Sequence, residues 1–228
     1  MITDYEAGVD LTVIDGLSVE SLSIQAGTNA RWPDTFPQGV RRLEYEYSSS
    51  SPGVDALPEL EVLRVWGNPK WSVIPRFASS VIREIDLDSR HLGSFSGQEL
   101  PSLISLKLSG LKDFNFSGFS TLNNLEVIEI VDSKGNLDAS RLESLRSLRR
   151  LVIDGPGIKV ENIRSLAGLP NLEFLFLGNS LIDGGEVSAI RECSGLKELA
   201  FRDRKGYDAT LEEILKDSGA RRIGLKFR

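Results

Sequence analysis

Apolar residues recur along this chain in a spacing that repeats every 20 to 24 residues. The pattern is L-x-x-L-x-L, in which Ile, Val or Phe can replace Leu, and the first copy, VESLSI, begins at Val19. The later copies begin at Val40, Leu60, Ile82, Leu103, Leu125, Leu148, Leu172 and Leu196, with a weak last copy, ARRIGL, at Ala220. Chance does not hold one period across about 200 residues, so the sequence predicts a repeat protein.

Within each copy, apolar and polar positions alternate with the period of a β-strand. In the copy LEFLFL, the last two Leu residues point to one face of the sheet, and Phe174 and Phe176 point to the other. One strand cannot bury its apolar face alone, so the copies are expected to stack as adjacent parallel strands. Between strands the apolar spacing lengthens to three or four, which predicts short helices on the other side of the molecule. These helices are expected near residues 142–148, 163–169, 187–193 and 211–215.

With its ten copies the sequence resembles the leucine-rich-repeat family over nearly its full length. The resemblance implies an α/β fold, a leucine-rich-repeat solenoid (horseshoe). Its curved parallel sheet would form the concave face, which commonly binds proteins, and short helices or 3₁₀ and extended segments would form the convex face. One position departs from the family, because the usual Asn three residues after the last strand Leu is present only as Asn68. Ser48, Ser133 and Ser180 stand at equivalent positions, and we expect Ser, water or irregular turns to satisfy the backbone there.

A single solenoid domain is expected over residues 1–228, with an N-terminal cap at 1–18 and the repeats at 19–228. The cap residues expected to pack on the first strand are Leu11, Val13 and Ile14. No separate C-terminal cap is expected. Basic residues should instead protect the last strand edge from pairing: Arg221, Arg222, Lys226 and Arg228.

Alternate strand residues should line up as three columns on the concave face, with neighbours about 4.8 Å apart. Charges alternate along part of the middle column: Glu44, Arg64, Asp86, Lys107 and Glu129. Such cross-strand pairs contribute about 0.2–1 kcal/mol each. The sequence therefore predicts that this ladder neutralises itself and is structural.

Apolar side chains gather at two places on the predicted concave face. The larger patch falls on three consecutive strands: Val127, Val131, Val152, Phe174 and Phe176. The smaller patch consists of Val62 and Trp66. An exposed apolar patch usually marks an interface, and aromatic residues ringed by charge are typical of a binding hot spot.

The charged ring of the larger patch is predicted to be Glu129, Arg150, Asp154 and Glu198. The two patches together with Arg150, Asp154 and Glu198 are the predicted partner-binding residues. The alternative is that a loop or a second copy of the chain covers the patch.

Candidate catalytic residues are few. His91 is the sole histidine, and Ser89, Ser94 and Ser96 lie near it in a Gly/Ser-rich turn. No catalytic residue is therefore predicted, and a hydrolase that uses His91 with Asp86 and Asp88 is the less favoured alternative. One Cys and one His cannot form a zinc site, and no Gly-rich phosphate loop is present. No metal or cofactor is expected, and Cys193 is predicted to be buried.

Charge is unevenly distributed along the chain. The net charge is -6, and residues 1–60 hold 3 basic and 10 acidic side chains, whereas residues 141–228 hold 16 and 13. The overall balance argues against a nucleic-acid partner. No apolar run approaches the length of a membrane span. The opening residues lack the basic region of a signal peptide, so a cytoplasmic protein is expected.

These features predict a non-catalytic protein–protein interaction module whose partner is another protein. The acidic N-terminal region favours a basic partner, and an intracellular inhibitor, such as a toxin-neutralising immunity protein, is one such function. An adaptor or regulatory protein, or a self-associating protein that forms a homodimer, is the alternative.

Overall fold

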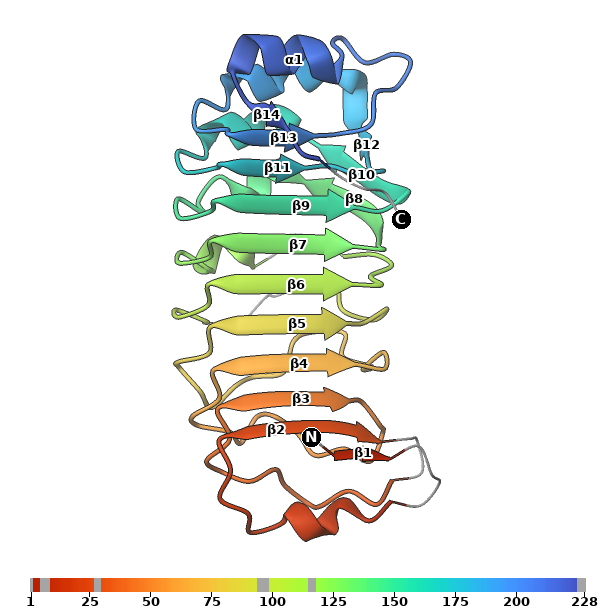
Figure 1. Cartoon of the computed structure of the whole chain (residues 1–228), viewed down its shortest axis with the longest axis vertical. Helices are drawn as coiled ribbons and strands as arrows, with labels where there is room; N and C mark the ends of the chain where they lie inside the picture. The colour runs from red at the N-terminus through yellow and green to blue at the C-terminus, as the bar shows by residue number, and fades with distance from the viewer. Residues whose placement is uncertain (1, 5–8, 27–29, 94–98, 115–117, 225–228) are drawn as a thin grey trace.

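The structure, a computed structural model, describes residues 2–4, 9–26, 30–93, 99–114 and 118–224. Its main feature is a parallel sheet of eleven strands that stack in chain order (Figure 1). The strands are β1 (Ile2–Asp4), β2 (Ser21–Ala26), β3 (Arg42–Glu46), β4 (Val62–Trp66), β5 (Glu84–Asp88), β6 (Ser105–Ser109), β7 (Val127–Val131), β9 (Arg150–Asp154), β11 (Phe174–Phe176), β13 (Glu198–Ala200) and β14 (Arg221–Arg222). Each of the ten repeats contributes one strand, and this confirms the predicted solenoid.

Short helices connect the strands on the convex side. They are η1 (Leu11–Ile14), η2 (Phe119–Thr121), η3 (Ala139–Leu142), η4 (Ile163–Gly168), η5 (Asp183–Gly185), η6 (Val187–Glu192) and α1 (Leu211–Ser218). All are 3₁₀ helices except α1, which has a capping box between Thr210 and Glu213 and ends at Gly219 in a left-handed conformation. These end signals explain why this segment alone extends into an α-helix.

A second, three-stranded parallel sheet was not predicted. It consists of β8 (Lys134–Asp138), β10 (Gly157–Glu161) and β12 (Leu181–Ile182), in the order β12-β10-β8. Each of these strands closely follows a strand of the main sheet. Ile158 and Val160 of β10 are buried, so the second sheet extends the core beyond the main strands.

The core lies between the main sheet and the convex segments. In β3, for example, Leu43 and Tyr45 are fully buried, while Arg42, Glu44 and Glu46 point to the other face. The predicted apolar positions of the convex segments are buried against the strands: Leu142, Leu145, Leu148, Ile163, Leu166, Leu169, Val187, Ile190, Cys193, Leu211 and Ile214. Burial of a large aliphatic side chain contributes about 1.5–3 kcal/mol, so each repeat is held chiefly by its neighbours.

Serine hydroxyls replace the missing Asn residues in several turns, as predicted. The Ser133 Oγ accepts a hydrogen bond from the Leu111 N–H at 3.1 Å, and the Ser180 Oγ donates to the Ile153 carbonyl at 3.1 Å. The one family-like residue, Asn68, has a left-handed backbone and accepts a hydrogen bond from the Arg90 N–H at 2.8 Å.

The N-terminal end of the solenoid differs in part from the expectation. Residues within the expected cap form β1, which adds a strand to the sheet beside β2. Leu11 and Ile14 are buried as predicted, but Val13 is 71% exposed. Its place in the 3₁₀ helix η1 explains this, because the helix turns Leu11 and Ile14 inward and Val13 outward.

The C-terminal end carries a register shift. The sequence pattern places Arg222 beside Glu198, but in the structure Glu198 pairs with Arg221. A slip of one residue sends every side chain of a strand to the other face, so Arg221 and Ile223 take the places expected for Arg222 and Gly224. Figure 1 shows α1, the convex helix expected near residues 211–215, beside β14 at this end of the stack. The other basic residues expected at this edge, Lys226 and Arg228, lie outside the described residues.

Candidate protein-binding face

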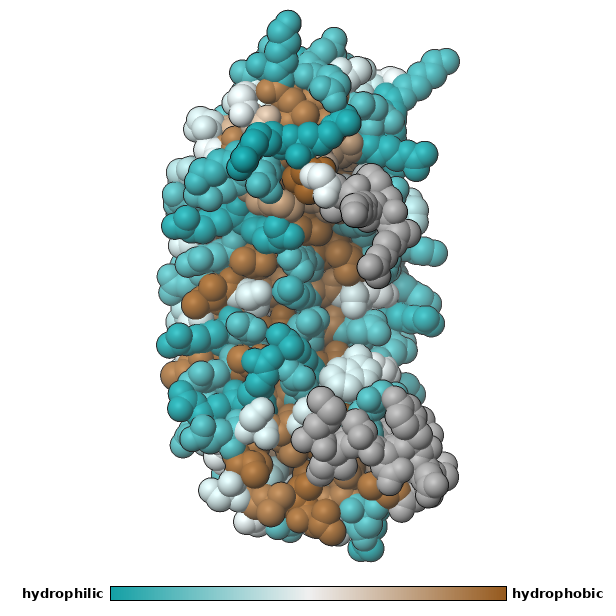
Figure 2. Space-filling view, viewed as in Figure 1, coloured by the Kyte–Doolittle hydropathy of each residue, from teal (hydrophilic) through white to brown (hydrophobic). Residues whose placement is uncertain are grey.

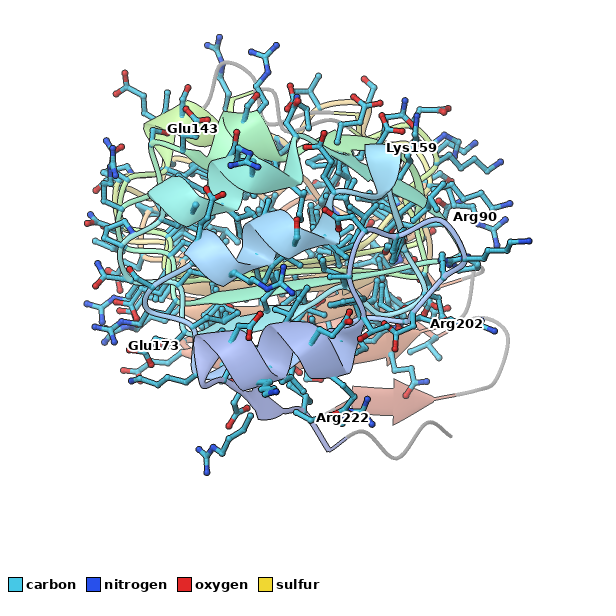
Figure 3. The ribbon with its side chains drawn as sticks, turned by 90° about the horizontal axis from the view of Figure 1, so that it is seen from above. Arg90, Glu143, Lys159, Glu173, Arg202 and Arg222 are labelled. Carbon is cyan, nitrogen blue, oxygen red and sulfur yellow. The ribbon has the colours of Figure 1, made fainter. Side chains whose placement is uncertain are left out.

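The face of the main sheet that points away from the core is the concave face of the family arrangement. Figure 3, a view down the stack, shows that the strands begin and end at opposite sides of the molecule. Glu173, which precedes β11, lies on one side, and Arg90 and Arg202, which follow β5 and β13, lie on the other. The concave face is the surface of the sheet that extends from the strand beginnings to the strand ends and points away from the core.

The predicted charge ladder forms, but its members pair unevenly. Glu44 binds Arg64 at 3.0 Å and Arg42 at 2.8 Å, and Glu129 binds Lys107 at 3.1 Å and Arg150 at 2.9 Å. Within the described residues, Asp86 has no hydrogen bond or ion pair, although it lies between Arg64 and Lys107 in the register. The cations of the ladder therefore pair with Glu44 and Glu129, and the Asp86 carboxylate remains unpaired among the described residues.

The pKa shifts of the two central acids differ in sign. Burial raises the pKa of the Asp86 carboxyl above its ordinary value, and attraction by Lys107 and Arg64 offsets only part of that effect. Burial also acts to raise the pKa of Glu129, but hydrogen bonds from Arg150 and Lys107 outweigh it, and that pKa is lowered. Glu129 ionises more readily than a free carboxyl because it receives hydrogen bonds from cations, and Asp86 ionises less readily because it is buried and receives none.

An apolar cluster lies on the concave face, separate from the main core. Its buried members are Val152, Phe176 and Ala200, and Val131, Phe174 and Ile223 pack against them while remaining partly exposed. Figure 2, which looks onto this face, shows apolar side chains among charged ones over the upper strands. We call these six residues the concave cluster.

The concave cluster differs from the predicted patch in its members and in its exposure. Sequence reasoning missed Ala200 and Ile223, and Val127 is not among the six. Ala200 continues an apolar run in the middle column after Val152 and Phe176, which was the available signal. Val152 and Phe176 are only 7% and 8% exposed, because neighbours cover them on both sides, so the patch is less exposed than predicted.

The predicted charges around the cluster are all engaged within the chain. The Arg150 guanidinium lies 3.8 Å from the centre of the Phe174 ring while it also binds Glu129. The Asp154 carboxylate accepts hydrogen bonds from the backbone and side-chain amides of Asn179, at 2.8 and 3.1 Å. Glu198 lies 3.8 Å from Arg221. The rim is therefore locally neutral.

The smaller predicted patch does not form a continuous apolar surface. Val62 and Trp66 are both half-buried at the two ends of β4, but Arg64 lies between them on the same face. Neither belongs to the concave cluster, and β5 and β6 separate β4 from β7. The structure therefore gathers the predicted apolar residues of the C-terminal half in the concave cluster, whereas Val62 and Trp66 lie outside it.

The residues weighed for chemistry are engaged in structural roles. The Ser89 Oγ is buried, donates to the Pro69 carbonyl at 2.9 Å and accepts from the backbone N–H of His91 at 3.2 Å, so its hydroxyl is bound to backbone groups. Ser94 and Ser96 lie outside the described residues. Cys193 is buried as predicted, and burial raises the pKa of its thiol to about 12. Across the described ranges, no three His, Cys, Asp or Glu side chains are grouped to hold a metal ion.

Comparison with known proteins shows a solved structure that shares this fold. No model of a known protein family matches the sequence. The solved structure of internalin C2 from Listeria monocytogenes is similar over 70% of this chain and 70% of its own, with 23% identity and a TM-score of 0.52. The chain has the fold of a leucine-rich-repeat solenoid. The predicted α/β solenoid is thus confirmed by the stacked sheet and by a fold shared with this solved structure.

Two further proteins are similar to the chain at lower structural similarity or over only part of its length. An internalin, InlF, also from Listeria monocytogenes, covers 88% of the chain and 71% of its own, with 17% identity and a TM-score of 0.43. Tsukushi from Gallus gallus is 29% identical over 136 residues, which are 55% of this chain. The chain spans 36% of the length of Tsukushi. In the part of the chain that the structure describes, every helix is too short or too polar to cross a membrane.

Proposed function

We propose that this leucine-rich-repeat protein is a non-catalytic protein-binding module and that its partner, another protein, contacts the concave face at the concave cluster. The observation that carries the proposal is the cluster itself. It places six apolar residues on the face opposite the core. Removal of their remaining apolar surface from water would contribute about 25 cal/mol per Å² to binding.

The members of the cluster have different parts in this proposal. Phe174 and Val131 are half-buried, so their remaining surface is available to a partner. Val152 and Phe176 lie beneath them and hold them in place. The Arg150 guanidinium on the Phe174 ring fixes the ring before binding, which reduces the entropy that a partner must overcome. A rigid aromatic side chain in a neutral rim is typical of a binding hot spot.

The narrower proposal is an inhibitor with a basic partner, such as a toxin-neutralising immunity protein. The net charge of -6 and the 10 acidic against 3 basic side chains of residues 1–60 support it. An excess of one charge speeds the approach of a partner of the opposite charge.

The test compares what three immobilised proteins capture from a cell lysate. The wild type is compared with Phe174→Lys, which places a charge at the half-buried edge of the cluster. Val81→Lys serves as the control, because Val81 is 42% exposed and precedes β5. A protein bound by the wild type and the control should lose at least about thirtyfold in affinity for Phe174→Lys, since a hot spot contributes about 2 kcal/mol or more.

Two results decide the proposal. Equal capture by all three proteins, with unchanged circular dichroism, contradicts a binding role for the cluster. Sedimentation of the purified chain addresses self-association: a dimer that Phe174→Lys dissociates would identify a second copy as the molecule that covers the cluster.

A further inference from the structure

A second distinctive feature of the concave face lies at the N-terminal end, away from the concave cluster. Trp66 is the last residue of β4, and the register pairs it with Glu46, the last residue of β3. Asp88 ends β5, the strand on the other side of β4. Since adjacent strands lie about 4.8 Å apart, the two acids stand on either side of the indole, about 10 Å from each other.

These three side chains have no partners among the described residues. The carboxylates of Glu46 and Asp88 form no ion pair or hydrogen bond there, and the Trp66 ring contacts no other ring or cation. Arg42 and Arg64 both bind Glu44. Arg90 follows Asp88 by two residues, but its guanidinium forms no ion pair with Asp88 among the described residues. This region therefore differs from the rim of the concave cluster, where each charge is paired within the chain.

We propose that Glu46, Trp66 and Asp88 receive an arginine side chain of the partner protein. A guanidinium is flat and carries five N–H donors, so it can stack on the indole and donate to carboxylates on both sides. Glu46 and Asp88, which flank the ring, form no ion pair among the described residues. A positively charged side chain of a partner would therefore complement them. This inference rests on the proposed function, since it adds a charged contact to an interface anchored at the concave cluster.

The spacing of the two contacts restricts the partner. Trp66 on β4 and Phe174 on β11 are five strand steps apart, about 24 Å, and are offset by four residues along the strand, about 13 Å, so they lie about 27 Å from each other. A partner must therefore present an arginine and an apolar side chain at about that separation. A protein interface of ordinary size spans such a distance.

The test uses two capped pentapeptides of glycine that carry either one arginine or one citrulline at the centre. Citrulline has nearly the same shape as arginine but no charge. Each peptide is titrated into the full chain, and the indole N–H signal of Trp66, assigned with Trp66→Phe, is followed by NMR. The signals of Trp32, in the core, and Trp71, packed on Tyr47 at 6.1 Å, serve as internal references.

We expect the arginine peptide to shift the Trp66 signal saturably and the citrulline peptide to leave it in place. The double variant Glu46→Gln with Asp88→Asn should raise the dissociation constant about fivefold, which corresponds to the loss of two exposed charge pairs. The matched control removes two exposed acids of the same N-terminal third, Asp34→Asn with Glu59→Gln, and should bind as the wild type does.

Three results would overturn the inference: equal shifts from both peptides, no shift at Trp66, or unchanged binding by the Glu46 and Asp88 variant. Failure of the proposed function is distinguishable from these. If partner capture survives Phe174→Lys while the arginine peptide still binds at Trp66, the cluster is not the anchor and the arginine site stands. If the peptide fails while capture depends on Phe174, only the arginine site is wrong.

Discussion

Glu129 connects the charge ladder to the concave cluster, and its replacement by Gln tests both. Its carboxylate is 22% exposed and binds Lys107 on β6 and Arg150 on β9. Glu129→Gln keeps the size of the side chain but removes both ion pairs and leaves two cations facing each other. Partly exposed pairs contribute about 0.2–1 kcal/mol each, so the free energy of unfolding should fall by about 0.5–2 kcal/mol.

The assay is urea unfolding followed by circular dichroism, with thermal unfolding as a second measurement. A loss of that size corresponds to a melting temperature lower by about 1–8 °C for a chain of this length. Glu143→Gln is the control, because Glu143 is exposed on the convex side (Figure 3) and its side chain has no described partner. It should unfold like the wild type.

The pH and salt dependence distinguish ion pairing from a general loss of packing. The pKa of Glu129 is lowered from 4.5, so its contribution to stability is present above that pH and is lost as the pH falls through the lowered value. The difference between wild type and variant should therefore disappear in acid and shrink in 1 M NaCl. A difference that persists unchanged in both conditions would refute this reasoning.

Three further predictions concern single groups. Ser133→Ala should lower the free energy of unfolding by about 1–3 kcal/mol in urea, because the Leu111 N–H loses its acceptor; an unchanged midpoint would contradict the role of serine in the turn. Asp86→Asn should raise the unfolding midpoint at pH 7, because a raised pKa means that the folded state disfavours the ionised form. That advantage should vanish below pH 3.8, and a destabilised variant at pH 7 would show that Asp86 is paired. Cys193 should react with iodoacetamide far more slowly in the folded chain than in urea at pH 8, since burial raises its pKa to about 12; equal rates would contradict its burial.

The hydrophobic pattern of the sequence alone was sufficient to predict the stacked parallel strands of the main sheet, but not the second sheet. Alternation within each copy identified the residues that face the core, such as Leu43 and Tyr45 of β3. The recurring motif then placed equivalent residues of successive strands side by side, which predicted the ladder from Glu44 to Glu129. Both inferences depend on local periodicity, which a strand preserves whatever surrounds it.

Only the tertiary structure decided the last register and the depth of the concave cluster. The sequence pattern placed Arg222 beside Glu198, whereas in the structure Arg221 pairs with Glu198 and Arg222 binds Glu212 of α1. Likewise, the pattern shows that Val152 and Phe176 point away from the core but does not show that neighbours cover them.

The choice of ion-pair partners also lay beyond the sequence. Arg64 and Lys107 each stand beside Asp86 in the register, yet they bind Glu44 and Glu129 and leave Asp86 alone. Periodicity fixes which residues are neighbours, because it follows from backbone geometry. The partner that a long charged side chain selects depends on distances and burial in three dimensions, and these exist only once the strands have stacked.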